Sequence, residues 1–118
     1  DENTLMGEPE MKFGSSIAAM IVPWLIGAKF AKEMLLCGDD RITAQRAYEL
    51  GLINQVCHNS SYFERALELA TQLAAYSAVS VQMTKKAINR SYDMSGMREA
   101  LLAAIDTATL IEANRPKS

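Results

Sequence analysis

Hydrophobic residues recur every three or four positions over most of this chain, a spacing that predicts helices. One continuous stripe lies on a helix predicted to begin near residue 61, and it consists of Phe63, Ala66, Leu67, Ala70, Leu73 and Ala74. A second series, on a helix predicted over residues 97–114, follows the alternating steps of four and three of a helix-packing seam, and it consists of Met97, Leu101, Ala104, Ala108 and Ile111. With further helices over 17–22, 28–36 and 81–92, the pattern predicts a mainly α structure.

The clearest local signals lie between residues 35 and 56. Gly38 has no Cβ atom and can take the left-handed conformation that ends the preceding helix. Thr43 can accept a hydrogen bond from the free N–H groups at the start of the next helix, which Gly51 ends. The apolar, partly β-branched run at 52–56 predicts a short strand or extended segment packed against the helices, so one or two short β segments are expected.

A stiff corner is predicted near the start of the chain, after a loop or short strand at residues 4–6. Pro9 fixes its own φ and pushes Glu8 toward an extended backbone. Glu10 therefore stands on a stiffened corner that can present its carboxylate.

Serine residues predict the starts of two helices. Ser15 or Ser16 is a candidate N-cap for the first predicted helix, which Pro23 would bend or restart. Ser61 and Glu64 have the spacing of a capping box, in which the serine accepts from the N–H three residues on and the glutamate reaches back to the serine N–H.

Composition narrows the classes of function. The chain has 118 residues, enough for one domain that buries roughly 65% of its unfolded surface. A net charge of −2 gives no reason to expect nucleic acid or an anionic membrane as partner. The apolar run at 17–28 is shorter than the ~20 residues that span a bilayer, and the polar start shows no secretory signal. Cys37 and Cys57 are isolated, so we expect reduced thiols and a cytoplasmic or comparable compartment.

Two motifs carry a resemblance to a known family. Residues 36–56 follow the pattern L-x-G-D-x-I-x-A-x-x-A-x-x-x-G-L-I-x-x-V, with one additional residue in the aspartate pair. Residues 7–10 are G-E-P-E, a G-x-P-E segment, and Phe13 and Gly14 follow. These motifs resemble the second half of the crotonase superfamily, the enoyl-CoA hydratases and isomerases. The resemblance is specific over roughly the first half of the chain and continues as a weaker helical pattern.

The resemblance implies the C-terminal helical part of a crotonase-like α/β fold, whose N-terminal half is a spiral of ββα units that this chain lacks. We therefore expect residues 1–118 to be a single unit and a fragment of a longer polypeptide. Residues 1–16 would end the core and hold the G-x-P-E corner, and residues 17–58 would supply helices and a short strand. Residues 59–118 would form a helical oligomerisation region, and the resemblance implies a homo-oligomer, a trimer or a hexamer of paired trimers.

The resemblance also implies a reaction. It places Glu10 on the glutamate that moves a proton at the carbon next to an acyl thioester, so the expected substrate is an acyl-CoA and the expected enzyme an enoyl-CoA hydratase or isomerase of fatty acid metabolism. The family stabilises the developing negative charge with two backbone N–H groups in an oxyanion hole. Those groups and a second glutamate belong, by resemblance, upstream of Asp1, so this chain alone is expected to be inactive. No metal or redox cofactor is implied.

The region after Gly14 departs from the hydratase pattern. Many hydratases have a P-G-x-G-G-T turn there, whereas this chain has S-S-I-A-A-M-I-V-P-W. Isomerisation and thioester hydrolysis therefore stay open as alternatives to hydration. A different class of function also stays open, a non-catalytic helical interaction module that binds a partner through the seam from Met97 to Ile111.

Other polar residues have simpler interpretations. Asp39 and Asp40 are typical turn formers, and His58, the single histidine, lies in a polar loop and is interpreted as structural. The basic residues of the penultimate helix could meet the phosphates of coenzyme A, but we favour a role in keeping that face soluble; they are Lys85, Lys86 and Arg90. The resemblance places Lys117, with Arg115, near the coenzyme A of a neighbouring subunit. The sequence shows no zinc signature or phosphate-cradling glycine loop.

Overall fold

The computed structural model describes residues 1–14 and 20–115. In chain order the elements are β1 (Leu5–Met6), the 3-10 helix η1 (Pro9–Phe13), α1 (Val22–Cys37), β2 (Ile42–Thr43), α2 (Ala44–Glu49), α3 (Tyr62–Ala74), α4 (Ala78–Met94) and α5 (Met97–Ala113). The described residues are thus mostly helical with two short strands, which confirms the predicted fold class.

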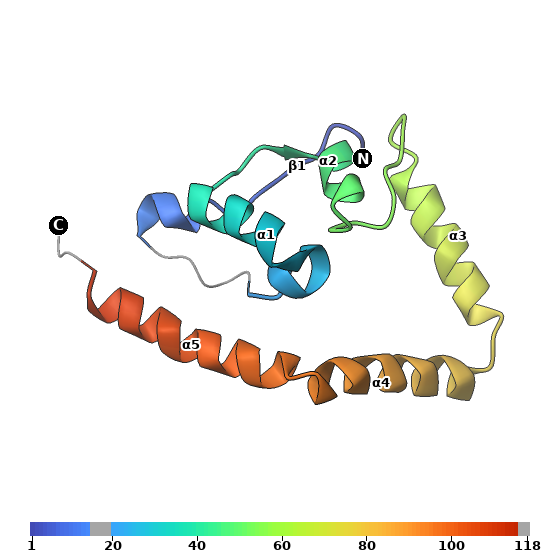
Figure 1. Cartoon of the computed structure of the whole chain (residues 1–118). Helices are drawn as coiled ribbons and strands as arrows, with labels where there is room; N and C mark the ends of the chain where they lie inside the picture. The colour runs from blue at the N-terminus through green and yellow to red at the C-terminus, as the bar shows by residue number, and fades with distance from the viewer. Residues whose placement is uncertain (15–19, 116–118) are drawn as a thin grey trace.

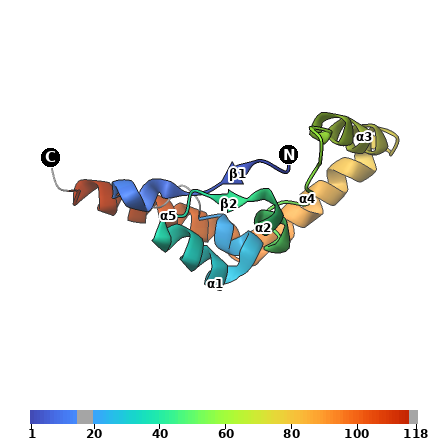
Figure 2. The ribbon, with the colours of Figure 1, turned by 90° about the horizontal axis from the view of Figure 1, so that it is seen from above.

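The elements form a small body with a long helical arm. Figure 1 shows β1, η1, α1, β2 and α2 gathered together, while α4 and α5 follow one another along one side and α3 turns back at the far end. The molecule is accordingly elongated, with extents of 54 × 37 × 25 Å. Figure 2 shows β1 and β2 side by side along one edge of the small body, with α1 on the other side of β2.

The core lies in the small body. Its buried residues come from α1, β2 and α2, and they are Val22, Ile26, Ala31, Met34, Leu35, Ile42 and Ala47. Phe30 and Leu50 pack against them while half-buried. The apolar residues of the two helices that flank Gly38 therefore share one core. The turn after α1 is anchored by this core, and the corner at Pro9 packs on that turn.

Three local signals act as the sequence predicts. Gly38 ends α1 in the left-handed conformation, with φ of 60°, and its N–H donates to the Leu35 carbonyl at 3.3 Å. The Thr43 hydroxyl accepts from the Arg46 N–H at 3.2 Å and so caps α2. Gly51 follows α2 with φ of 81°.

The strands are only partly where the sequence places them. β1 falls within the predicted segment at residues 4–6, and it pairs antiparallel with β2, Leu5 opposite Thr43 and Met6 opposite Ile42. No strand forms at residues 52–56, since 52–54 are bends and 55 and 56 belong to no helix or strand, but Leu52 and Ile53 pack against the core as expected. Their N–H groups turn back onto α2, and that of Leu52 donates to the Ala47 carbonyl at 2.9 Å.

Helix α1 contains the predicted helix over 28–36 but only Val22 of the one predicted over 17–22, whose residues 17–19 lie outside the described residues and whose residues 20 and 21 form a turn. It begins at Val22 with Pro23 in its first turn, and Gly27, with φ of 77° and ψ of 158°, interrupts it before the predicted helix over 28–36. The predicted N-caps Ser15 and Ser16 lie outside the described residues. Among the residues that the structure does describe, none belongs to a helix both long and apolar enough to cross a membrane.

The three helices of the arm agree with the sequence apart from the predicted capping box. The Ser61 hydroxyl donates to the His58 carbonyl at 2.8 Å and accepts nothing from the first turn of α3, so that prediction is wrong. Asn59 and Ser60 take positive φ just before it, and this tight turn brings the His58 carbonyl within reach. α4 extends beyond the predicted range at both ends, whereas α5 starts at Met97 as predicted.

The two apolar series of the arm have different surroundings. On α3 the stripe faces solvent, with Phe63 66% and Leu73 56% exposed. On α5 the seam from Met97 to Ile111 is the covered face: Ala104 is buried, and the other four seam residues are half-buried. α5 therefore packs along its seam, while the stripe of α3 stays open.

Candidate active site

The corner that carries Glu10 is seated on the turn after α1. The Glu8 N–H donates to the Asp39 carbonyl at 3.0 Å. Gly7 approaches the same turn so closely that a Cβ atom on it would lie 2.3 Å from the Asp39 carbonyl oxygen. Only a glycine fits there, and this contact explains the first residue of the G-E-P-E segment.

A half-exposed ion pair ties the same two segments together. The Lys12 ammonium, in η1, lies 2.9 Å from the Asp40 carboxylate. The hydrogen bond from Lys12 is the main cause that lowers the pKa of Asp40 below its ordinary value. Asp39 takes the role of a turn former, since its carboxylate accepts from the Arg41 N–H at 2.9 Å. Asp39 and Asp40 therefore have a structural role, as the sequence predicts.

Proline gives the corner its shape. Pro9 is the first residue of η1, and Glu8 before it has an extended backbone with φ of −134° and ψ of 82°, as the sequence predicts. Gly14 ends η1 with φ of 77°, and its N–H donates to the Met11 carbonyl at 3.2 Å. Glu10 thus sits in the first turn of a short helix that is fixed at both ends.

The side chains of Glu8 and Glu10 meet at this corner. Both residues are half-buried. The Oε1 atom of Glu8 and the Oε2 atom of Glu10 are closed to solvent, and no described residue offers either atom a hydrogen bond. A hydrogen bond between the two carboxyl groups would satisfy these atoms, and it would require a proton on one of them.

Burial, followed by the hydrogen bond and charge repulsion from Glu10, raises the pKa of Glu8 to about 7. Below this pH, Glu8 therefore keeps a proton that an ordinary glutamate has lost. The sequence interpretation singled out Glu10 and missed Glu8. The readable signal was the E-P-E order, which places a carboxyl group before and after a rigid proline.

The basic residues proposed for coenzyme A are dispersed. Lys117 lies outside the described residues. Arg115, at the end of α5, lies 3.6 Å from the Glu112 carboxylate, and its Nε atom is 4.0 Å from the point where a Cβ on Gly14 would stand. The structure thus brings Arg115 to the end of η1. The three basic residues of α4 are exposed, consistent with the favoured role in solubility.

His58 serves in a structural contact. Its Nδ1 atom lies 2.5 Å from the Glu2 carboxylate, whose other oxygen accepts from the Asn59 N–H at 2.9 Å. The hydrogen bond with His58 is the main cause that lowers the pKa of Glu2. Both cysteines are free thiols, Cys37 exposed and Cys57 half-buried. Within the described residues no three His, Cys, Asp or Glu side chains gather into a potential metal site.

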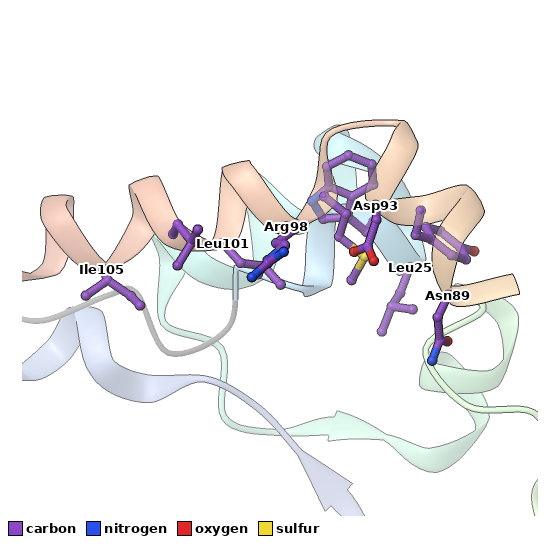
Figure 3. A pocket seen from close by; sticks show the side chains of 10 residues that line it. Leu25, Asn89, Asp93, Arg98, Leu101 and Ile105 are labelled. Carbon is purple, nitrogen blue, oxygen red and sulfur yellow. The ribbon is translucent and has the colours of Figure 1, made fainter. Parts of the chain in front are cut away.

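A separate apolar cavity of about 530 Å³ lies between the start of α1 and the junction of α4 and α5 (Figure 3). Leu25 from α1 faces Asn89 and Asp93 of α4, and Leu101 and Ile105 of α5 continue the lining. Glu10 does not line this cavity. The enclosure of Glu10 therefore comes from its covered carboxyl oxygen and not from this cavity.

Comparison with known proteins places these features in context. The family model described as enoyl-CoA hydratase/isomerase matches residues 1–112. The chain is 31% identical over 97 residues to a mitochondrial enoyl-CoA hydratase of Pongo abelii, a match that covers 80% of this chain and 33% of the relative. It is 34% identical over 97 residues to 2,3-dehydroadipyl-CoA hydratase of Escherichia coli, a match that covers 80% of this chain and 38% of that relative.

A solved structure shows the same arrangement of elements. The enoyl-CoA hydratase/isomerase of Xanthobacter autotrophicus Py2 superposes with a TM-score of 0.91 and 40% identity, over 94% of this chain and 41% of that one. The present chain spans about a third of the length of the curated relatives it matches.

Proposed function

The chain belongs to the enoyl-CoA hydratase/isomerase family, and from this premise we propose that the whole protein adds water across the double bond of an enoyl-CoA thioester, with Glu10 as the acid/base. The observation that carries the proposal is the seating of Glu10. It stands on a corner held by Gly7, Pro9 and the Lys12 ion pair, and one of its carboxyl oxygens is closed to solvent.

The chemistry needs a carboxyl group of this kind. In hydration the water oxygen bonds to the carbon two positions from the thioester carbonyl, and a proton is delivered to the carbon between them. A fixed carboxyl group can carry that proton because its orientation is set before the reaction begins. No electrons leave or enter the substrate, so the proposal assigns no redox cofactor.

The negative charge on the thioester oxygen must also be stabilised. We assign the two oxyanion N–H groups, and the second glutamate, to residues outside this chain, as the resemblance implies. Within residues 1–118 we assign Glu10 to proton transfer and Lys117, with Arg115, to the phosphates of coenzyme A.

Self-association is the second part of the proposal. The stripe on α3 and the outer face of α5 leave large apolar side chains open, among them Phe63, Leu67, Leu73, Leu102, Ile105 and Leu110. We propose that α3, α4 and α5 bury these residues against other copies in a trimer or hexamer. The alternative, an interaction module that uses the Met97–Ile111 seam, is less favoured because that seam is the covered face of α5.

The reaction is tested with two acyl-CoA probes. The whole protein is incubated with crotonyl-CoA, whose double bond is conjugated with the thioester, and separately with a 3-enoyl-CoA. The proposal predicts a 3-hydroxyacyl-CoA from crotonyl-CoA, identified by mass spectrometry. Movement of the double bond in the second probe without hydration of the first would replace hydration with isomerisation. A free acid with free coenzyme A would indicate thioester hydrolysis.

A further inference from the structure

The G-E-P-E segment holds a second carboxyl group next to the proposed acid/base. Glu8 and Glu10 flank Pro9, both are half-buried, and each holds one carboxyl oxygen that is closed to solvent and finds no partner among the other described residues. The N–H of Glu8 is fixed to the Asp39 carbonyl, so this carboxyl group is held from the turn after α1. The proposed reaction assigns a role to Glu10 and none to Glu8.

The neighbouring charged groups have other partners. Lys12 pairs with Asp40, and the Asp39 carboxylate accepts from the Arg41 N–H. Arg115, at the end of α5, contacts Glu112 beyond Gly14. The shift at Glu8 accordingly has no cause among charged groups other than Glu10. Of the described ionisable side chains, Glu10 is thus the one that meets Glu8.

We propose that Glu8 is a positioning residue for Glu10: its protonated carboxyl group donates a hydrogen bond that fixes the Glu10 carboxylate in one orientation. The inference rests on the proposed function, because it gives Glu8 a task in the reaction that Glu10 performs. An acid/base must hold its free oxygen toward the substrate carbon, and a hydrogen bond to its other oxygen restricts the rotation that would turn it away. Glu8 touches neither the substrate nor the reacting atoms.

The contact depends on pH. Glu8 loses its proton as the pH rises through about 7, and the donor is then replaced by a second negative charge beside Glu10. The orienting hydrogen bond is therefore present below this pH and is lost above it. Glutamine at position 8 has an N–H donor at every pH, whereas alanine has none.

The test measures kcat and KM against pH in the whole protein for wild type, Glu8→Gln and Glu8→Ala. The wild type is expected to lose kcat as the pH rises through about 7, and Glu8→Gln is expected to lack this decline. Glu8→Ala is expected to lower kcat by about 10-fold below neutral pH with little change in KM, because orientation and not binding is lost. An unchanged kcat in Glu8→Ala, or the same decline in Glu8→Gln as in wild type, would overturn the proposal.

A second measurement separates this inference from the proposed function. NMR with isotope-labelled glutamate follows the Glu8 carboxyl carbon as the pH is changed. The contact predicts a midpoint at about 7 that moves downward in Glu10→Gln, since the hydrogen bond and the repulsion are removed together. A midpoint at the ordinary value of 4.5 would overturn the inference. A midpoint at about 7 in a protein that hydrates no acyl-CoA would overturn the proposed function and leave the contact supported.

Discussion

Gly7 and Asp40 are packed so closely that a Cβ atom on Gly7 would lie 2.1 Å from the Cα atom of Asp40. The two residues are far apart in sequence, yet this contact locks the corner that carries Glu10 onto the turn that ends α1. Since the turn is part of the small core, the position of Glu10 is coupled to the stability of α1.

Gly7→Ala tests this coupling. Backbone atoms must move to make room for the methyl group, so we expect the free energy of unfolding to fall by about 3 kcal/mol, the upper end of the usual cost of overpacking. Urea denaturation measures it. The matched control is Gly96→Ala, where φ is 93° but nothing lies within 4 Å, and strain alone should cost about 1 kcal/mol. An equal loss of stability in the two variants would show that Gly7 and Asp40 are not packed tightly.

Thr43 and Ser61 offer a comparison of two residues in the same sequence role. Thr43→Ala removes the hydrogen bond that caps α2 and is expected to cost about 1 kcal/mol in the free energy of unfolding. Ser61→Ala removes no cap from α3 and is expected to change stability by less than about 0.5 kcal/mol. Chemical denaturation of both variants checks this. A larger loss of stability in Ser61→Ala would indicate that the Ser61 hydroxyl does cap α3.

Glu8 should also make stability depend on pH. Its pKa is raised from 4.5 to about 7 by folding, so between these values the folded state keeps a proton that the unfolded chain releases. Stability therefore falls as the pH rises through this window. Glu8→Gln cannot titrate and should remove this component, on the order of 1 kcal/mol once solvent screening of the partly exposed group is included. Urea denaturation of wild type and Glu8→Gln, at pH values below and above this window, measures the difference. The same change of stability with pH in both proteins would contradict the raised pKa of Glu8.

The Lys12–Asp40 pair should make stability depend on pH in the opposite direction. Its hydrogen bond lowers the pKa of Asp40, so the stabilisation is present above the ordinary value of 3.8 and is lost as the pH falls through the lowered one. Lys12→Met should remove this acid-dependent component, and added salt should weaken it in the wild type because the pair is half-exposed. Thermal unfolding at low and high salt measures both effects. Acid unfolding that is identical in Lys12→Met would assign the sensitivity to other carboxylates.

Local chemistry was predictable from the sequence. Gly38, the Thr43 cap and the start of α5 at Met97 depend on residues within one turn of each other, and the structure confirms them. The capping box failed for a reason that is also local. A serine hydroxyl can donate as well as accept, and the tight turn at Asn59 placed the His58 carbonyl within its reach.

Long-range contacts were not predictable from the same signals. β2 exists because Ile42 and Thr43 meet Leu5 and Met6 across the body, and a run of two residues carries no strand pattern of its own. The openness of the α3 stripe was equally hidden, since spacing shows which residues share a face and not what covers it. The role of Glu10 in the reaction stays a prediction, and so does the role of Lys117.

The most direct measurement is kcat for crotonyl-CoA hydration by the whole protein carrying Glu10→Gln, with Glu64→Gln on the exposed surface of α3 as the matched control. Loss of the proton carrier is expected to lower kcat by about 100-fold or more, while binding of the acyl-CoA and the circular dichroism spectrum stay as in wild type. Glu64→Gln is expected to keep the wild-type rate. A Glu10→Gln protein that hydrates crotonyl-CoA at the wild-type rate would contradict the assignment of Glu10 as the acid/base.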